Sequence, residues 1–154
     1  MKELRLRLQT TSQLPLSRQT VINIFLLNTC VKNDLLNVLK PHELSLEQFN
    51  VLRILRGQKG NPINLQDIQE RMVNKMSNTT RLVDKLILKG YVKRNQCEEN
   101  RRKIEIYITS EGLNILKDLD PIIDQTEQDI TSNLSKTELE QLNKLLLKLK
   151  KNKP

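Results

Sequence analysis

The chain has 154 residues, room for one domain with helical extensions, and its 26 basic against 18 acidic side chains leave a net charge of +8. Few aromatic residues (3%), four glycines and five prolines argue against a loop-rich or all-β protein and favour helices packed through aliphatic side chains. With one histidine and two cysteines that have no close partner, the chain has too few ligands for a zinc site, so we expect it to be metal-free. We find no apolar run near the roughly 20 residues that span a bilayer and no signal-peptide stretch. We therefore expect a cytoplasmic protein with no membrane partner.

The first predicted helix covers residues 17–40, where apolar side chains recur at helical spacing until Pro41 ends the pattern. Its apolar stripe is broader than one core-facing side requires. We therefore expect one side to pack on its own domain and the other on a partner. Cys30 lies on or near this stripe with few basic neighbours, so we expect it to be buried and unreactive.

Two shorter helices follow, each with a recognisable start. Residues 45–48, Ser-Leu-Glu-Gln, form a capping box that begins the second predicted helix. Glycines, an asparagine and a proline then break the helical pattern and leave Ile63 isolated, as in a very short strand. Asn64 is a suitable N-cap for a third helix over 65–72.

A fourth helix is predicted from about residue 75 to Lys89. Asn74 and Ser77 are both candidates for its N-cap, and Gly90 suits a left-handed C-terminal cap. Its buried face is expected to hold Met76, Leu82, Val83 and Leu86, with Thr79 as a further candidate. Two short helices joined by a tight connection are typical of a helix-turn-helix.

The residues after this helix pair have the period of strands. Residues 91–94 predict one strand, Ile104–Ile108 predict a second, and the polar segment 95–103 would form the tip between them. Two strands with a charged tip directly after a helix-turn-helix form a wing. Thr109 then begins another helix, which Pro121 is expected to kink or divide. A second capping box at 135–138 begins a final, leucine-rich helix.

The basic excess is concentrated in the helix-turn-helix and wing, because residues 75–107 carry nine basic and four acidic side chains, a net of +5. A surface that faces phosphates is expected to have this bias, and a solvated basic face is the alternative. The second helix of a helix-turn-helix presents the polar side of its N-terminal end to the major groove. The candidate contacts there are Lys75, Ser77, Asn78, Thr80, Arg81 and Lys85.

These side chains suit different parts of duplex DNA. Asparagine pairs with adenine edges and arginine with guanine edges, whereas Lys75, Lys85 and Lys89 suit contacts to phosphates. At the tip of the wing, Arg101, Arg102 and Lys103 would reach phosphates or enter the narrow minor groove. A catalytic site is not indicated, because the single imidazole, His42, lies in a connector and no phosphate-binding loop or nucleophile motif occurs. We therefore expect no enzyme and no cofactor.

Several segments, taken in order and spacing, resemble the MarR family of transcription regulators. They are Leu46-Glu47-Gln48-Phe49-Asn50-Val51-Leu52-Arg53-Ile54-Leu55, Thr80-Arg81-Leu82-Val83-Asp84-Lys85-Leu86, Lys89-Gly90-Tyr91-Val92, Asn100-Arg101-Arg102 and Ile108-Thr109-Ser110-Glu111-Gly112. The resemblance implies a mainly α homodimer with a winged helix-turn-helix and a small β-hairpin wing in each subunit. It assigns an N-terminal dimerisation helix to 17–40, a DNA-binding lobe to 45–112 and C-terminal dimerisation helices to 113–150.

Proteins of this kind typically bind pseudo-palindromic operators in double-stranded DNA, repress transcription and often respond to small phenolic or other anionic ligands, or to thiol oxidation. Two positions depart from the family pattern. Asn100 replaces the aspartate that supports the arginine of the wing, kept here as Arg102, and Lys75 replaces the residue that caps the recognition helix. A non-specific architectural DNA-binding protein and a protein-interaction module remain as alternative functions.

Overall fold

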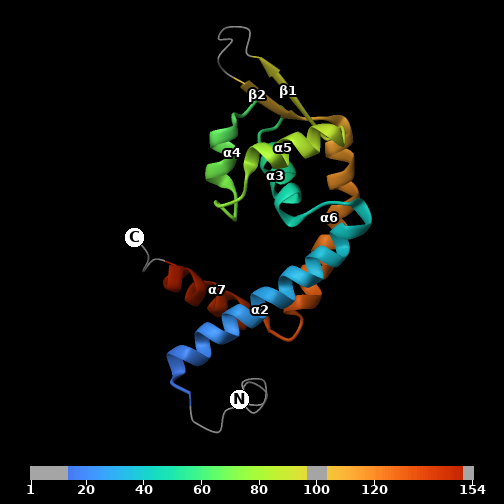
Figure 1. Ribbon diagram of the computed structural model, residues 1–154. Helices are drawn as coiled ribbons and strands as arrows, with labels where there is room; N and C mark the ends of the chain where they lie inside the picture. Colours follow the sequence, from blue (N-terminus) through green and yellow to red (C-terminus); the bar gives the residue numbers. More distant parts are fainter. Residues whose placement is uncertain (1–13, 97–103, 151–154) are drawn as a thin grey trace. The chain divides into compact units, whose positions relative to one another are not determined.

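In the computed structural model, residues 14–96 and 104–150 are described, and the chain divides into two compact units, residues 1–33 and 34–154. The described part of the first unit is the greater part of helix α2 (Leu16–Leu39). The second unit continues with the 3-10 helix η1 (Lys40–His42), α3 (Leu46–Arg56), α4 (Leu65–Arg71), α5 (Thr79–Leu88), β1 (Val92–Gln96), β2 (Ile104–Ile108), α6 (Ser110–Thr131) and α7 (Lys136–Lys150) (Figure 1). The predicted mainly α fold with one small hairpin is confirmed.

The predicted helix starts at Ser45 and Asn64 are confirmed in atomic detail. The Ser45 hydroxyl accepts a hydrogen bond from the Gln48 N–H at 3.1 Å, and the Gln48 side chain accepts one from the Ser45 N–H at 3.0 Å. Asn64 Oδ1 accepts from the Asp67 N–H at 2.8 Å. These caps satisfy N–H groups that have no partner inside the helix, so both helices begin where the polar residues stand.

The second unit has one continuous apolar core, to which α3 contributes most. Helix α3 packs against α4, α5, α6 and β2, and its fully buried side chains lie at the centre. Buried core residues are Leu39, Leu44, Phe49, Val51, Leu52, Leu55, Ile63, Ile68, Met72, Val83, Leu86, Val92, Ile106, Leu116, Leu119 and Ile123. Arg56 at the end of α3 also pairs with Asp120 of α6 at 2.6 Å. The α3–α5 segment and the first half of α6 therefore form one packed body.

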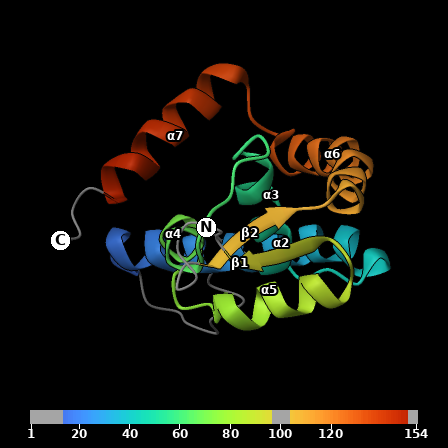
Figure 2. The ribbon, with the colours of Figure 1, turned by 90° about the horizontal axis from the view of Figure 1, so that it is seen from above.

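The hairpin is antiparallel, with Val92 opposite Ile108 and Gln96 opposite Ile104. In the view of Figure 2, β1 lies on the side of α5 and β2 on the side of α3, in agreement with their packing contacts. Ile63 exchanges two backbone hydrogen bonds with Ile106, which confirms the predicted short strand. The first strand begins one residue later than predicted because the Tyr91 N–H donates back to the Leu86 carbonyl at the end of α5.

The N-terminal boundary predicted for the fourth helix was wrong. Helix α5 begins at Thr79, and its N-cap is Asn78 instead of Asn74 or Ser77. Met76 was expected on the buried face, but its side chain is 93% exposed, whereas Thr79, the further candidate, is buried. Residues between Met72 and Asn78 form a turn because several side chains bind their backbone, as described below.

Two glycines hold positions that other residues would strain. Gly90, with φ of +75°, ends α5 through two hydrogen bonds, from its own N–H to Ile87 and from the Tyr91 N–H to Leu86, which confirms the predicted cap. Gly112 lies so close to the hairpin that a Cβ atom there would be 2.3 Å from the Tyr91 carbonyl oxygen. Helix α6 thus approaches the backbone before β1 directly.

The terminal helices bury little of their apolar surface in the single chain. Helix α6 runs without interruption through Pro121, so the proline does not divide it. No side chain of α7 is buried, and α2 buries only Leu39. The expectation that Cys30 is buried was wrong, because its side chain is exposed on α2 among the described residues.

Candidate nucleic-acid interface

The turn between α4 and α5 is held by polar side chains from three sides. Asn50 of α3 accepts a hydrogen bond from the Val73 N–H at 3.0 Å, and Asn74 accepts one from the Met76 N–H at 3.1 Å. The side-chain amide of Gln69 in α4 donates to the Lys75 carbonyl and accepts from the Thr79 hydroxyl. The turn therefore has a defined backbone although most of its side chains are exposed.

Beyond the turn, α5 has one buried and one exposed face. Asn78 Oδ1 accepts from the Arg81 N–H at 3.0 Å, which begins the helix. Thr79, Val83 and Leu86 are buried in the lobe. The exposed face carries Thr80 and Arg81 in the first turn and Lys85 one turn later. Since residues four apart lie on the same side of a helix, Arg81 and Lys85 point the same way.

The predicted contact residues thus divide into three groups. Thr80, Arg81 and Lys85 lie on the exposed face of α5, as expected, and Lys75 is exposed in the turn. Asn78 is exposed but uses its side-chain oxygen as the cap, so its amide N–H groups remain as donors. Ser77 is half-buried, and its hydroxyl oxygen is shielded from solvent, without a partner among the described residues. Ser77 is therefore less accessible than a base contact requires.

The hairpin is connected to α5 by an ion pair. Arg94 Nη2 of β1 lies 2.8 Å from Asp84 Oδ1 of α5, and each of the two side chains is partly shielded. On the same strand, the Lys93 ammonium lies 5.5 Å from the centre of the Tyr107 ring. The ion pair joins β1 to α5, whereas the Lys93–Tyr107 contact lies within the hairpin, between β1 and β2. The predicted wing residues Asn100, Arg101, Arg102 and Lys103, like Cys97, lie outside the described residues.

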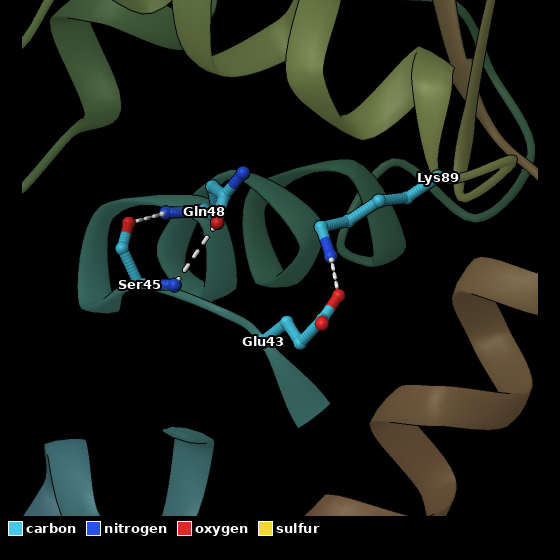
Figure 3. A network of polar contacts seen from close by, with 4 residues as sticks. All are labelled: Glu43, Ser45, Gln48 and Lys89. Atoms are coloured by element: carbon cyan, nitrogen blue, oxygen red, sulfur yellow. Dashed lines mark hydrogen bonds and ion pairs between the residues drawn. The ribbon is translucent and has the colours of Figure 1, made fainter. Parts of the chain in front are cut away.

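The other end of α5 is anchored to the segment before α3. Figure 3 shows Lys89 reaching across to Glu43, with Nζ 3.0 Å from Oε2, beside the capping box of Ser45 and Gln48. The hydrogen bond and the charge of Lys89 lower the pKa of Glu43. Lys89, predicted to bind phosphate, is therefore engaged within the lobe. It fixes the C-terminal end of α5 while the N-terminal end is presented.

Other kinds of site find no support in the part of the chain that the structure describes. Over residues 14–96 and 104–150, no group of three or more histidine, cysteine or acidic side chains is arranged to hold a metal ion. Within the same ranges, no helix has the length and apolar character needed to cross a bilayer.

Sequence reasoning missed the residues that position the interface. Asn50, Gln69, Asp84 and Arg94 are polar side chains without a local motif, and their partners lie on other elements. The sequence held one signal for Gln69. It follows Ile68, a buried residue, in a helix of only seven residues, so its side chain lies close to the next helix. The pairing of Asp84 with Arg94 depends on how α5 meets β1, which no spacing rule predicts.

Comparisons with known proteins agree on one family. Residues 44–104 match the family model described as MarR family. The HTH-type transcriptional regulator PecS of Dickeya dadantii is 31% identical over 117 residues, which cover 74% of this chain and 69% of PecS. The crystal structure of a mutant MarR from E. coli complexed with operator DNA superposes with a TM-score of 0.75 and 26% identity, covering 88% of this chain and 94% of that one.

The similarity to other curated relatives extends over a smaller part of their length. An uncharacterized HTH-type transcriptional regulator, YfiV of Bacillus subtilis, is 35% identical over 77 residues. That alignment covers 50% of this chain and 47% of YfiV, so the chain spans about half the length of this relative. The family model, by comparison, matches residues 44–104, which include α3, α4, α5 and β1 and end at the first residue of β2.

Proposed function

Since this chain belongs to the MarR family, we propose that it is a sequence-specific DNA-binding regulator of transcription, a repressor that responds to a small ligand or another signal. The observation that carries the proposal is the exposed end of α5, where Thr80, Arg81 and Lys85 project from a helix fixed at both ends. A rigid helix with a polar, basic end suits the major groove of duplex DNA. The relatives named above, which are transcription regulators, support the same function and not an enzymatic one.

In this proposal each side chain has a distinct contact. Arg81 donates to a guanine edge, and the free amide N–H groups of Asn78 donate to base acceptors. Lys75, Lys85 and the hydroxyl of Thr80 bind phosphates or adjacent edges. Ser77 contributes less, because its hydroxyl is shielded.

The wing completes the contact beside the groove. Its tip residues Arg101, Arg102 and Lys103 enter the minor groove or bind its phosphates, with Asn100 supporting Arg102 by a hydrogen bond. The ion pair of Asp84 with Arg94 keeps the strands that lead to this tip in a constant relation to α5. The major-groove and minor-groove contacts can then be made together.

The functional unit in this proposal is a homodimer formed through segments 17–40 and 113–150. Helices α2 and α7 expose many large apolar side chains in the single chain. Among them are Val21, Ile24, Phe25, Leu27, Leu145, Leu146, Leu147 and Leu149. So much exposed apolar surface is typical of a protein interface. A two-fold dimer would place two lobes on an inverted repeat, with half-sites one helical turn or a multiple apart.

A small effector has a candidate place in the same lobe. An open hollow of about 440 Å³ lies where α2 ends and α3 begins, lined by Leu36, Asn37, Lys40, Glu43, Leu44, Ser45 and Gln48. Its size is within the usual range for small-molecule sites. Lys40 has no ion pair among the described residues, whereas the Glu43 carboxylate is already bound to Lys89. The hollow therefore suits a small anionic or phenolic ligand.

Binding there would act on α5 through the Glu43–Lys89 pair, which links the wall of the hollow to the recognition helix. Titration with a panel of hydroxybenzoates, followed by calorimetry, tests the site. Lys40→Met should weaken binding at least about tenfold, since a hydrogen bond to a charged group contributes about 1.5–3 kcal/mol. Lys59→Met alters a loop lysine outside the hollow, so it should leave the affinity for the ligand unchanged. Equal binding by both variants would remove the effector site from the proposal.

The decisive experiment for DNA binding is selection of bound sequences from random duplexes, followed by titration of the selected operator. Arg81→Ala should weaken operator binding by about 1–3 kcal/mol and relax specificity at one position of each half-site. Lys85→Ala should weaken binding to all duplexes alike, and it should reduce the number of counterions released on binding by about one. Lys117→Ala, an exposed cation on α6, is the matched control.

Two outcomes would contradict this function. If Arg81→Ala bound the operator as tightly as the unaltered protein, α5 would not be the recognition helix. If no sequence were enriched and random duplexes bound equally well, the protein would instead be a non-specific architectural DNA-binding protein.

A further inference from the structure

Two apolar side chains in the α4–α5 turn are almost completely exposed. Val73 is 90% exposed and Met76 93%, whereas Met72, immediately before them, is buried in the core. Single exposed apolar residues are common on protein surfaces. These two, however, lie in a turn with a fixed backbone, directly before the residues proposed to contact DNA.

Their exposure is enforced by the hydrogen bonds of the turn. The Val73 N–H is bound by the Asn50 side chain of α3, and the Met76 N–H by the side chain of Asn74. Gln69 holds the Lys75 carbonyl between them. These bonds hold the backbone of the turn, and both side chains project from it into solvent, so their apolar surface is available to a partner.

The identity of that partner follows from where Met76 stands in the sequence and the fold. Met76 directly precedes Ser77 and the N-cap Asn78, so it lies at the end of α5 that carries Thr80 and Arg81. A side chain at this end faces the major groove when α5 enters it. The only apolar group that base pairs present in the major groove is the C5-methyl of thymine.

We propose that Met76, with Val73 beside it in the turn, contacts a thymine C5-methyl group and so selects thymine at one position of each half-site. This inference rests on the proposed function and adds a specificity determinant to it. The polar side chains of α5 read hydrogen-bonding groups, and Met76 reads a methyl group that they do not recognise. Methionine suits this contact, because its flexible, polarizable side chain adapts to irregular apolar surfaces.

Replacing thymine by deoxyuridine tests the contact directly, because this change removes the methyl group and keeps every hydrogen-bonding atom. Each thymine of the selected operator is replaced in turn, and binding of the unaltered protein is measured. One replacement per half-site should weaken binding about fourfold, the value expected for burying one methyl group.

The same scan with Met76→Ala identifies the side chain responsible. This variant should bind the thymine operator at least about fourfold more weakly, and the sensitive position should then tolerate deoxyuridine without further loss. Leu88→Ala is the matched control, since Leu88 is 87% exposed on α5 but lies at its other end. That variant should keep the full sensitivity to deoxyuridine. Unfolding midpoints should be unchanged, because both side chains are exposed.

The outcomes separate this inference from the function on which it rests. Specific operator binding that is insensitive to deoxyuridine, or equally sensitive in Met76→Ala, would overturn the thymine contact alone. Absence of any enriched sequence would overturn sequence-specific binding itself, and the thymine contact with it.

Discussion

The winged lobe and helix α7 are both rich in leucine, yet they bury it to very different extents. Leu52 and Leu86 in the lobe have no exposed surface, because α3 and α5 pack on each other and on the hairpin. Helix α7 has no buried residue, and its leucines 145–147 and Leu149 are 44–60% exposed. Both regions have well-formed caps, since Ser135 and Glu138 complete the second predicted capping box.

The difference shows that a helix can be well specified locally without being stabilised by its own chain. Caps and spacing determine where α7 begins, but isolated helices of this length are marginal in water. Burial of apolar surface supplies most of the stability of a folded helix. The lobe is therefore stabilised by contacts within one chain, and in the proposed homodimer the terminal helices are stabilised by contacts between chains.

The largest expected effect is in the lobe. Leu52→Ala should lower the free energy of unfolding by about 2–5 kcal/mol, because it leaves a cavity at the centre of the core. Urea denaturation monitored by circular dichroism measures the change. Leu88→Ala, at an exposed leucine of the same lobe, should change it by less than about 0.5 kcal/mol. Similar losses for both variants would contradict the burial described here.

A second prediction concerns α7. The double variant Leu145→Ala/Leu149→Ala should raise the dimer dissociation constant by about tenfold or more per leucine, about 1.4 kcal/mol each, because the proposed homodimer buries this apolar surface between its subunits. Sedimentation equilibrium measures this constant. Glu140→Ala, at a polar position of the same helix, should have little effect. A chain that stays monomeric at every concentration, without substitution, would overturn the comparison.

A smaller effect distinguishes the two asparagines near the start of α5. Asn78→Ala removes the N-cap and should lower the free energy of unfolding by about 1 kcal/mol. Asn74→Ala removes one hydrogen bond from an exposed turn, so it should lower the free energy of unfolding by a smaller amount. Thermal or urea unfolding without DNA separates the two. A larger loss for Asn74 would mean that α5 begins earlier, as the sequence alone indicated.

The smallest expected effect is electrostatic. The pKa of Glu43 is lowered from 4.5 by the hydrogen bond and charge of Lys89. A carboxyl with a lower pKa in the folded than in the unfolded chain adds stability above the unfolded-state pKa. That stability is lost as the pH falls through the folded-state pKa.

Lys89→Met should therefore raise the pKa of Glu43 toward its ordinary value in an NMR titration. The stability difference between variant and unaltered protein should disappear in acid. Glu138, whose pKa is lowered by hydrogen bonds from Ser135, should titrate unchanged in the same experiment. If the pKa of Glu43 were the same in Lys89→Met as in the unaltered protein, the ion pair would be absent in solution.

Local chemistry in the sequence determined much of the lobe. Ser45, Asn64 and Gly90 mark helix ends through hydrogen bonds within a few residues, so their patterns were sufficient. The alternation of Ile104, Ile106 and Ile108 predicted the second strand for the same reason. The exposure of Thr80, Arg81 and Lys85 followed from the periodicity of α5.

Only the tertiary structure decided where α5 begins and what positions it. Asn74, Ser77 and Asn78 are all plausible caps by type, and the choice depends on Asn50 and Gln69, which hold the turn from other helices. The same contacts leave Met76 exposed, against the helical pattern. The bond from Asn50 joins residues 23 apart in the chain, and those from Gln69 join α4 to the turn and to α5, so they form only when these helices have packed. The sequence specified the elements, and packing selected among their possible boundaries.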